Sequence, residues 1–355
     1  MQSAINKISQ CSSKKSSQDT CDEAKTRILN VMTSEKKQVR SSVPQRKPLI
    51  HHSTRQPTTT TKVSLKTVAD GVVLSKRLLD DVRTKNNVTV HHVDHERDQR
   101  INHDLSKYNL NYVFDKTRHS ESIKYRLSFN NDDITLPKSM DLRSKCGDIF
   151  DQGDLGSCVS NSTSFCMRFL FTNFNNEKFV PSRLFIYYNG RIIENEDINE
   201  DSGLMVMDGY KSVVKYSACG ENNWAYDVTK FAQQPPKQCY AAAKEHKHLK
   251  GSSLTSNGLK ACLVAGFPIS FGAALFESFM SDTTAQSGIV PIPDENTEER
   301  VGGHCMTIVG YDDSKSAFLV ANSWSDKWGI KGYCWFPYKY MLNENLVTEF
   351  WTFRF

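Results

Sequence analysis

The stretch that decides the fold is Asp151–Cys158, which reads Asp-Gln-Gly-Asp-Leu-Gly-Ser-Cys and runs directly into an apolar segment. That segment, Val159–Phe171, carries its hydrophobic residues at helical spacing and predicts a helix. A cysteine in the first turn of a helix lies at the positive end of the helix dipole, beside free backbone N–H groups. Both effects stabilise the thiolate, which is the nucleophilic form. Cys158 is therefore the candidate nucleophile, and the side-chain amide of Gln152 can stabilise an oxyanion together with the Cys158 N–H.

A thiolate nucleophile needs a base, and the best candidate lies far downstream. His304 precedes a predicted strand, Cys305–Tyr311, and follows Cys158 by 304−158=146 residues. Eighteen residues further on, Asn322 begins the run Asn-Ser-Trp. An amide in that position can hold the imidazole in orientation, and Trp324 can shield the bond between them from water.

Taken together and in this order, these motifs resemble the papain family of cysteine peptidases. The matching elements are Gln-Gly-x-x-Gly-Ser-Cys, Gly-His before an apolar strand, Asn-Ser-Trp and Trp-Gly-x-x-Gly-Tyr, and they extend over Leu136–Phe355. The form Gln-Gly-x-Leu-Gly-Ser-Cys is similar to a variant branch of the family found in microbes and large DNA viruses. The resemblance implies one role for each matched residue: an oxyanion-binding Gln152, a nucleophilic Cys158, a general acid/base His304 and an orienting Asn322.

Other residues match the family less distinctly. Gly203 resembles the family's contact with the substrate backbone, and Gly303 and Trp324 are expected to take part in substrate binding. Leu155 stands where secreted members have a disulfide-forming cysteine, so that bridge cannot form here. Gly303, next to the base, replaces a larger side chain and predicts a more open pocket. Val159 replaces a tryptophan, so the packing behind the sulfur is expected to differ.

The order of the remaining elements predicts an α+β fold. Three further helices are expected before the strands begin, at Ser182–Asn189, Asp208–Tyr216 and Leu254–Ala265, the last capped by Ser256. The last third of the chain predicts four strands bounded by Gly or Asp turns: Pro268–Ala274, Cys305–Tyr311, Ala317–Asn322 and Gly332–Pro337. The resemblance implies two lobes, a helical one that carries the nucleophile and a barrel-like sheet that carries the histidine and asparagine.

Charge divides the 355-residue chain into unlike parts. Residues 1–135 carry 24 Lys+Arg and 15 Asp+Glu, or +9, which leaves −4 for residues 136–355 and gives the net +5. Residues 1–66 are basic, rich in Ser, Thr and Lys and poor in large apolar residues, which predicts disorder. Residues 67–135 are expected to be a partly ordered extension and a candidate pro-segment, and residues 136–355 a catalytic domain.

The pro-segment interpretation rests on length and on aromatic residues. The helical pattern of the common cathepsin pro-segments is absent, but Tyr108–Ile134 contains Tyr112, Phe114, Tyr125 and Phe129. We expect this stretch to pack over or near the cleft. The preceding group of His91, His92, Asp94, His95 and His103 matches no zinc spacing and is interpreted as a solvated polar face.

The sequence thus predicts a cysteine-type endopeptidase that acts on proteins or peptides and needs no metal or organic cofactor. One alternative is a catalytically silent module whose basic tail binds nucleic acid or a component of a virion or cell. Another is acyl transfer through the same thioester. The first twenty residues lack an apolar core typical of a signal peptide, and no stretch is apolar enough to span a membrane. The predicted location is intracellular, or within a virion. Weak contact of the tail with nucleic acid or anionic surfaces is expected at most.

Overall fold

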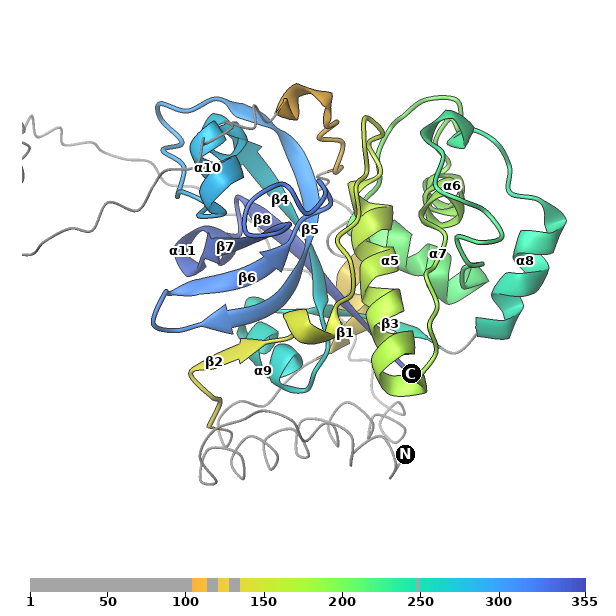
Figure 1. Cartoon of the computed structure of the whole chain (residues 1–355), viewed down its shortest axis with the longest axis horizontal. Coiled ribbons are helices and arrows are strands. Elements are labelled where there is room, and N and C mark those ends of the chain that lie inside the picture. The colour runs from red at the N-terminus through yellow and green to blue at the C-terminus, as the bar shows by residue number, and fades with distance from the viewer. Residues whose placement is uncertain (1–103, 114–120, 128–134, 247–248) are drawn as a thin grey trace, which may run out of the picture. The chain divides into compact units, whose positions relative to one another are not determined.

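The structure is a computed structural model, and it describes residues 104–113, 121–127, 135–246 and 249–355 (Figure 1). The longer helices gather on one side and the strands, together with several short helices, on the other, with helix α5 between them (Figure 1). The predicted α+β class is therefore confirmed. The predicted tail, residues 1–66, and the histidine group lie outside the described residues.

Helix α5 (Cys158–Leu170) is the central element, and all of its 13 residues are buried. A sequence of this polarity can be buried because its small hydroxyl side chains find partners. Ser162 Oγ donates to Met306 O at 3.0 Å, and Ser164 Oγ donates to Pro181 O at 2.7 Å. The helix was expected to bury one face, but the sheet covers one side and other helices cover the opposite side.

Those helices are α6 (Arg183–Glu194), α7 (Val206–Tyr216) and α8 (Lys237–Ala243). The side chain of Ser182 accepts a hydrogen bond from the Phe185 N–H at 3.2 Å and so caps α6. The predicted helices at Ser182–Asn189 and Asp208–Tyr216 are confirmed, and α6 continues to Glu194. Helix α8 was not predicted.

The helix predicted over Leu254–Ala265 is wrong in its first half. Residues Lys250–Leu254 form strand β3, Ser256–Gly258 form a 3-10 turn, and helix α9 spans only Leu259–Val264. The cause is tertiary, because β3 pairs with the last strand of the chain, which the sequence reading missed. Ser256 lies within the turn rather than capping a helix.

The described strands form one sheet in the order β1-β3-β8-β4-β5-β6-β7, with β2 paired to β5. Their bounds, and those of the short helices α10 and α11 that flank the sheet, are β1 Arg126–Leu127, β2 Ser139–Asp141, β4 Ile269–Phe276, α10 Asp282–Ser287, β5 Arg300–Asp312, β6 Ala317–Ala321, β7 Tyr333–Pro337, α11 Tyr338–Met341 and β8 Val347–Arg354. All four predicted strands are present. β4 is buried along its whole length.

Strand register brings the downstream motifs together. Thr307 of β5 pairs with Ala321 of β6, so the residues just before Thr307 lie beside those just after Ala321. Across the gap between sheet and helices, Gln152 N donates to Ser323 O at 2.8 Å. The loop before α5 is thereby joined to the end of β6.

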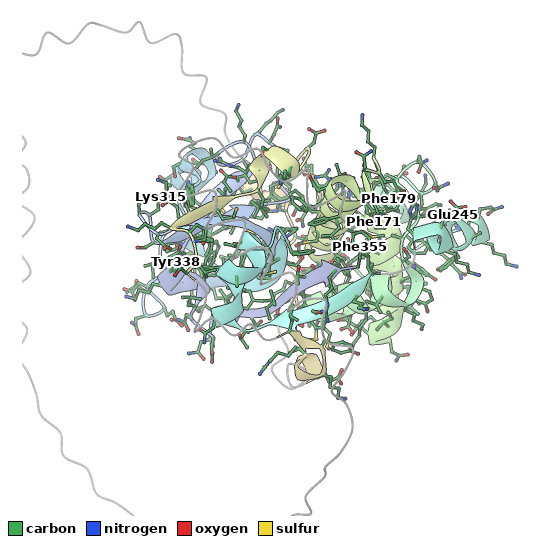
Figure 2. All side chains as sticks on the ribbon, turned by 90° about the horizontal axis from the view of Figure 1, so that it is seen from below. Phe171, Phe179, Glu245, Lys315, Tyr338 and Phe355 are labelled. Carbon is green, nitrogen blue, oxygen red and sulfur yellow. The ribbon has the colours of Figure 1, made fainter. Side chains whose placement is uncertain are left out.

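The C-terminus ties the sheet to the helical side. Figure 2 shows Phe171, Phe179 and Phe355 close together, with ring centroids 5.8 Å apart for Phe171–Phe355 and 5.2 Å for Phe171–Phe179. The end of β8 is therefore packed against the segment that follows α5. No helix in the described part of the chain combines the length and apolar character needed to cross a membrane.

Candidate active site

His304 is oriented by Asn322. His304 Nε2 lies 2.8 Å from Asn322 Oδ1, which also accepts from the Ser323 N–H at 2.8 Å. Because an amide oxygen only accepts, Nε2 carries the ring proton and Nδ1 remains as the basic nitrogen. Nδ1 has no hydrogen-bond partner among the described residues. The Trp324 ring covers the pair, with its centroid 4.9 Å from that of His304.

Cys158 is the first residue of α5, and its thiol lies beside the backbone N–H groups of Val159 and of Cys305, the neighbour of His304. Burial raises the pKa of the Cys158 thiol to about 12 and lowers the pKa of His304 to about 4. Burial thus favours the neutral form of each group, because the charged form loses its hydration.

The side-chain amide of Gln152 is held at both ends. Its Oε1 accepts from Ser323 Oγ at 2.6 Å, which leaves Nε2 to donate. Nε2 donates to Leu155 O at 3.1 Å and to Asn109 O at 3.3 Å. A backbone carbonyl from the N-terminal extension thus lies against the group expected to bind the oxyanion.

That carbonyl belongs to residues 104–113, which we call the cleft segment. Tyr112 N donates to Gly303 O at 3.0 Å, and Val113 N donates to Leu204 O at 3.2 Å. Both contacts are parallel β-bridges, Asn111 with Gly303 and Tyr112 with Leu204. The cleft segment therefore binds through its backbone between the sheet and the loop before α7.

Glycines make room for the cleft segment. A Cβ atom on Gly203 would lie 1.7 Å from Asn111 O, and one on Gly303 would lie 2.4 Å from Tyr112 O. At Gly272 in β4, a Cβ would lie 2.0 Å from the Tyr112 ring. The open pocket expected at Gly303 is thus filled here by the backbone of Tyr112. Gly203 faces the segment with its Cα, while its N–H donates inward to Tyr187 Oη at 3.2 Å.

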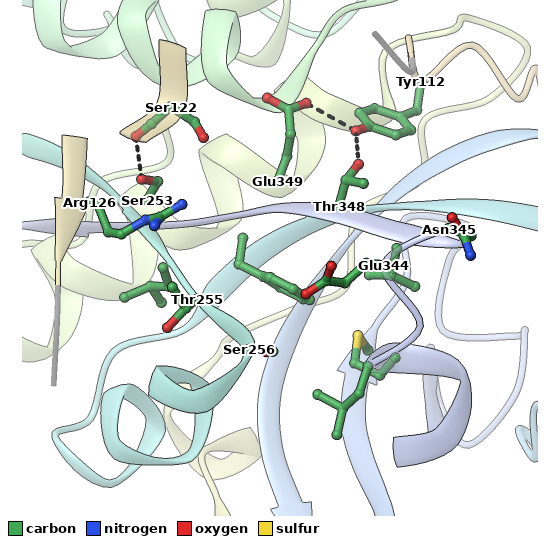
Figure 3. Close-up of a pocket in the computed structure, with 15 residues that line it drawn as sticks. Tyr112, Ser122, Arg126, Ser253, Thr255, Ser256, Glu344, Asn345, Thr348 and Glu349 are labelled. Carbon is green, nitrogen blue, oxygen red and sulfur yellow. Dashed lines mark hydrogen bonds between the residues drawn. The ribbon is translucent and has the colours of Figure 1, made fainter. Parts of the chain in front are cut away.

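Two buried tyrosines anchor the cleft segment. The Tyr108 ring stacks on Trp324 at a centroid distance of 4.7 Å and an angle of 10°. The hydroxyl of Tyr112 lies 2.8 Å from Thr348 Oγ1 and donates to Glu349 Oε2 at 3.0 Å (Figure 3). Within the stretch expected to pack over or near the cleft, Tyr108 and Tyr112 make such contacts. Phe114 and Phe129 of the same stretch lie outside the described residues.

Glu349 is the residue near the cleft that the sequence reading missed. It lies in β8 with a positive φ of 57°, is only 3% exposed, and accepts from Val206 N at 3.0 Å and Met207 N at 3.2 Å. These N–H groups begin helix α7, so the carboxylate caps that helix. The only signal in the sequence is an acidic residue inside an apolar C-terminal run. Burial raises the pKa of Glu349 to about 7.

This raised pKa predicts a pH-dependent stability. A carboxyl whose pKa rises from its ordinary 4.5 to about 7 on folding stabilises the fold fully below pH 4.5, and that contribution is lost as the pH rises through 7. Relative to Glu349→Gln, the full-length protein is expected to lose about 3 kcal/mol of unfolding free energy between about pH 4.5 and pH 8. Chemical denaturation at both pH values measures the difference.

The matched control for that comparison is Glu344→Gln. Glu344 is exposed and lines the same cavity of about 470 Å³ beside Tyr112 and Glu349 (Figure 3). We expect Glu344→Gln to leave the pH dependence of the unfolding free energy unchanged. If the unfolding free energies of the original chain and Glu349→Gln change with pH in the same way, Glu349 is not the group responsible.

Two further cysteines near the site, Cys166 and Cys305, are buried in the core. Within the described ranges, no three His, Cys, Asp or Glu side chains lie close enough together to hold a metal ion. The candidate site therefore consists of Cys158, His304, Asn322 and Gln152, with Trp324 over it and the cleft segment across it.

Comparison with known proteins agrees with this geometry. The model of the papain family cysteine proteases matches residues 136–348. An uncharacterized peptidase C1-like protein of Acanthamoeba polyphaga mimivirus is 40% identical over 229 residues, which make up 61% of this chain and 71% of that protein.

Solved structures show the same fold. Xylellain, a cysteine protease from Xylella fastidiosa, superposes with a TM-score of 0.63 at 31% identity, over 70% of this chain and 96% of that one. Procathepsin B of Trypanosoma congolense gives a TM-score of 0.54 at 17% identity, over 79% of this chain and 98% of that one. The fold is papain-like, and the chain belongs to the papain family of cysteine proteases.

Proposed function

We propose that the protein is a cysteine endopeptidase in which Cys158 is the nucleophile and His304 the general acid/base. The observation that carries this proposal is the hydrogen bond of 2.8 Å from His304 Nε2 to Asn322 Oδ1, which leaves Nδ1 as the basic nitrogen, in a site where Cys158 begins helix α5. Nδ1 is thereby free to take the thiol proton.

The reaction follows from these positions. His304 Nδ1 accepts the proton of Cys158, and the thiolate attacks the carbonyl carbon of a peptide bond. Gln152 Nε2 and the Cys158 N–H stabilise the oxyanion, since Ser323 already holds Gln152 Oε1. The intermediate collapses to a thioester as His304 protonates the leaving amine. Water, deprotonated by His304, then attacks the thioester and releases the acid and the thiol.

We propose further that the protein is made in an inactive form. The cleft segment places Asn109 O against Gln152 Nε2 and Tyr108 on Trp324, so a substrate has no access to these groups. Cys158 and His304 are fully buried, and burial holds the pKa of the Cys158 thiol at about 12 and that of His304 at about 4. Removing the segment exposes both groups to water and favours the ion pair.

A reducing compartment is the proposed setting. Leu155 occupies the position of the family's bridge cysteine, and the eight described cysteines are all free. In such a compartment a thiol nucleophile stays reduced.

The function is tested with the segment displaced but the chain intact. In the released variant, Tyr108→Ala removes the stack on Trp324 and Tyr112→Asp places a carboxylate next to Glu349. Incubated with a denatured protein, this variant is expected to produce new internal peptide termini, identified by mass spectrometry.

Adding Gln152→Ala to the released variant is expected to lower kcat by about 10²–10³-fold, because one oxyanion donor is lost. Gln234→Ala, an exposed glutamine in the same half of the molecule, is the control and should leave the rate unchanged. If the released variant produces no new termini, the endopeptidase proposal is wrong. If Gln152→Ala cleaves at the full rate, Gln152 is not the oxyanion residue.

A further inference from the structure

Both walls of the cleft depend on one carboxylate. Asp201 Oδ2 accepts from the Gly156 N–H at 2.8 Å, two residues before the nucleophile. Asp201 Oδ1 accepts a short hydrogen bond from the Tyr187 hydroxyl, and that hydroxyl accepts from the Gly203 N–H at 3.2 Å. A continuous chain of hydrogen bonds therefore runs from the Cys158 loop through Asp201 and Tyr187 to Gly203.

A buried arginine supports this chain of hydrogen bonds. Arg191 lies one helical turn after Tyr187 in α6 and places its guanidinium 4.3 Å from the centre of the Tyr187 ring. Its Nη1 donates to Ile198 O at 2.8 Å and to Glu200 O at 2.7 Å. Arg191 thus fixes the loop that leads into Asp201, and a planar guanidinium suits two such carbonyls.

We propose that Asp201 and Tyr187 are positioning residues that set the distance between the nucleophile loop and the substrate-binding backbone. This inference rests on the proposed peptidase function. We call Asp201, Tyr187 and Arg191 the Asp201 clamp. The Asp201 clamp connects the nucleophile loop to Gly203 through hydrogen bonds alone.

The cleft segment also contacts the clamp. Asn109 Nδ2 donates to Asp201 Oδ2 at 3.3 Å, and Asn111 Nδ2 donates to the Asp201 carbonyl at 2.8 Å. The bonds from Gly156 and Tyr187 do not involve the segment. The clamp therefore stays intact when the segment leaves and can position the open site.

The two positioning residues are expected to affect different steps. Tyr187→Phe in the released full-length variant loses the hydrogen bonds with Gly203 and with Asp201 Oδ1 but keeps the bond between Asp201 and Gly156. It should raise KM for a peptide about tenfold, with kcat changing less than about twofold. Asp201→Ala also frees Gly156 and should lower kcat about tenfold as well, because the nucleophile and the oxyanion donors shift. Besides burial, the Asp201 carboxylate raises the pKa of the Cys158 thiol, so loss of its charge alone would speed alkylation of Cys158 by iodoacetamide. Slower alkylation in Asp201→Ala is expected nonetheless and therefore reports the displaced loop, whereas Tyr187→Phe should leave the rate unchanged.

The control is Tyr240→Phe, which removes a hydroxyl that donates to Asn189 Oδ1 at 3.1 Å elsewhere in the helical half. It should leave KM, kcat and alkylation unchanged. Because Asp201 and Tyr187 act through one network, the double variant should lose no more than about twofold beyond Asp201→Ala.

The outcomes separate the two proposals. An unchanged KM in Tyr187→Phe, or losses that multiply in the double variant, overturns the clamp while the peptidase function stands. If the released variant itself cleaves nothing, the function fails, and the alkylation rates of Asp201→Ala and Tyr187→Phe still decide the clamp.

Discussion

Cys158→Ala in the released variant is expected to reduce peptide hydrolysis by at least about 10⁴-fold. No other described thiol can substitute, since the other described cysteines are also buried and none begins helix α5. The remaining rate reflects only the oxyanion donors and substrate binding. Initial rates with a fluorogenic peptide measure the loss.

The control for this substitution is Cys262→Ala in the same background. Cys262 is a fully buried thiol in α9, so its loss tests whether removing any buried sulfur lowers activity by unfolding the protein. We expect its rate to stay within about threefold of the released variant. A Cys158→Ala protein that keeps more than a tenth of the activity would show that hydrolysis depends on another group.

The second large effect concerns the cleft segment. The released variant is expected to hydrolyse peptides at least about 100-fold faster than the original chain. Truncating one buried aromatic side chain costs about 3–5 kcal/mol, and about 2.7 kcal/mol already corresponds to a hundredfold change in the covered fraction. Tyr112→Asp adds repulsion with Glu349, which is 3% exposed. The measurement compares kcat/KM of the two full-length proteins.

Tyr125→Ala is the matched control for that comparison. Tyr125 also belongs to the N-terminal extension and packs on Trp351 at a ring distance of 5.5 Å, but it is 40% exposed and away from Trp324. Its loss should leave the protein as inactive as the original chain. Equal activity of the original chain and the released variant would mean that the cleft segment does not inhibit.

The sequence predicted those parts of the site that lie in short motifs. Gln152 and Cys158 stand six residues apart at the start of a helix, whereas His304 lies within β5 and Asn322 directly follows β6, its neighbour in the sheet. The positions of these residues can be predicted from their spacing in the sequence and from the pairing of two neighbouring strands. The placement of Gly203 beside the cleft came from resemblance, and its inward N–H bond to Tyr187 is visible only in the structure.

What the sequence could not predict are contacts between distant segments. Tyr112 and Glu349 are separated by 237 residues, and their hydrogen bond depends on a bend in β8 where Glu349 takes a positive φ. β8 is buried on both faces, so exposed and buried residues do not alternate along it, and this strand and its partner β3 were missed. The role of Asp201 could not be predicted either, because it depends on the folded positions of Gly156 and Tyr187.

The central claim is that Cys158 is a reactive nucleophile that the cleft segment keeps covered. The most direct test is labelling of the full-length protein with an epoxide probe for thiol proteases, followed by intact-mass analysis. We predict slow labelling of the original chain, fast labelling of the released variant at one site, and none when Cys158→Ala is added. Equal labelling of the first two proteins, or labelling that survives Cys158→Ala, would contradict the claim.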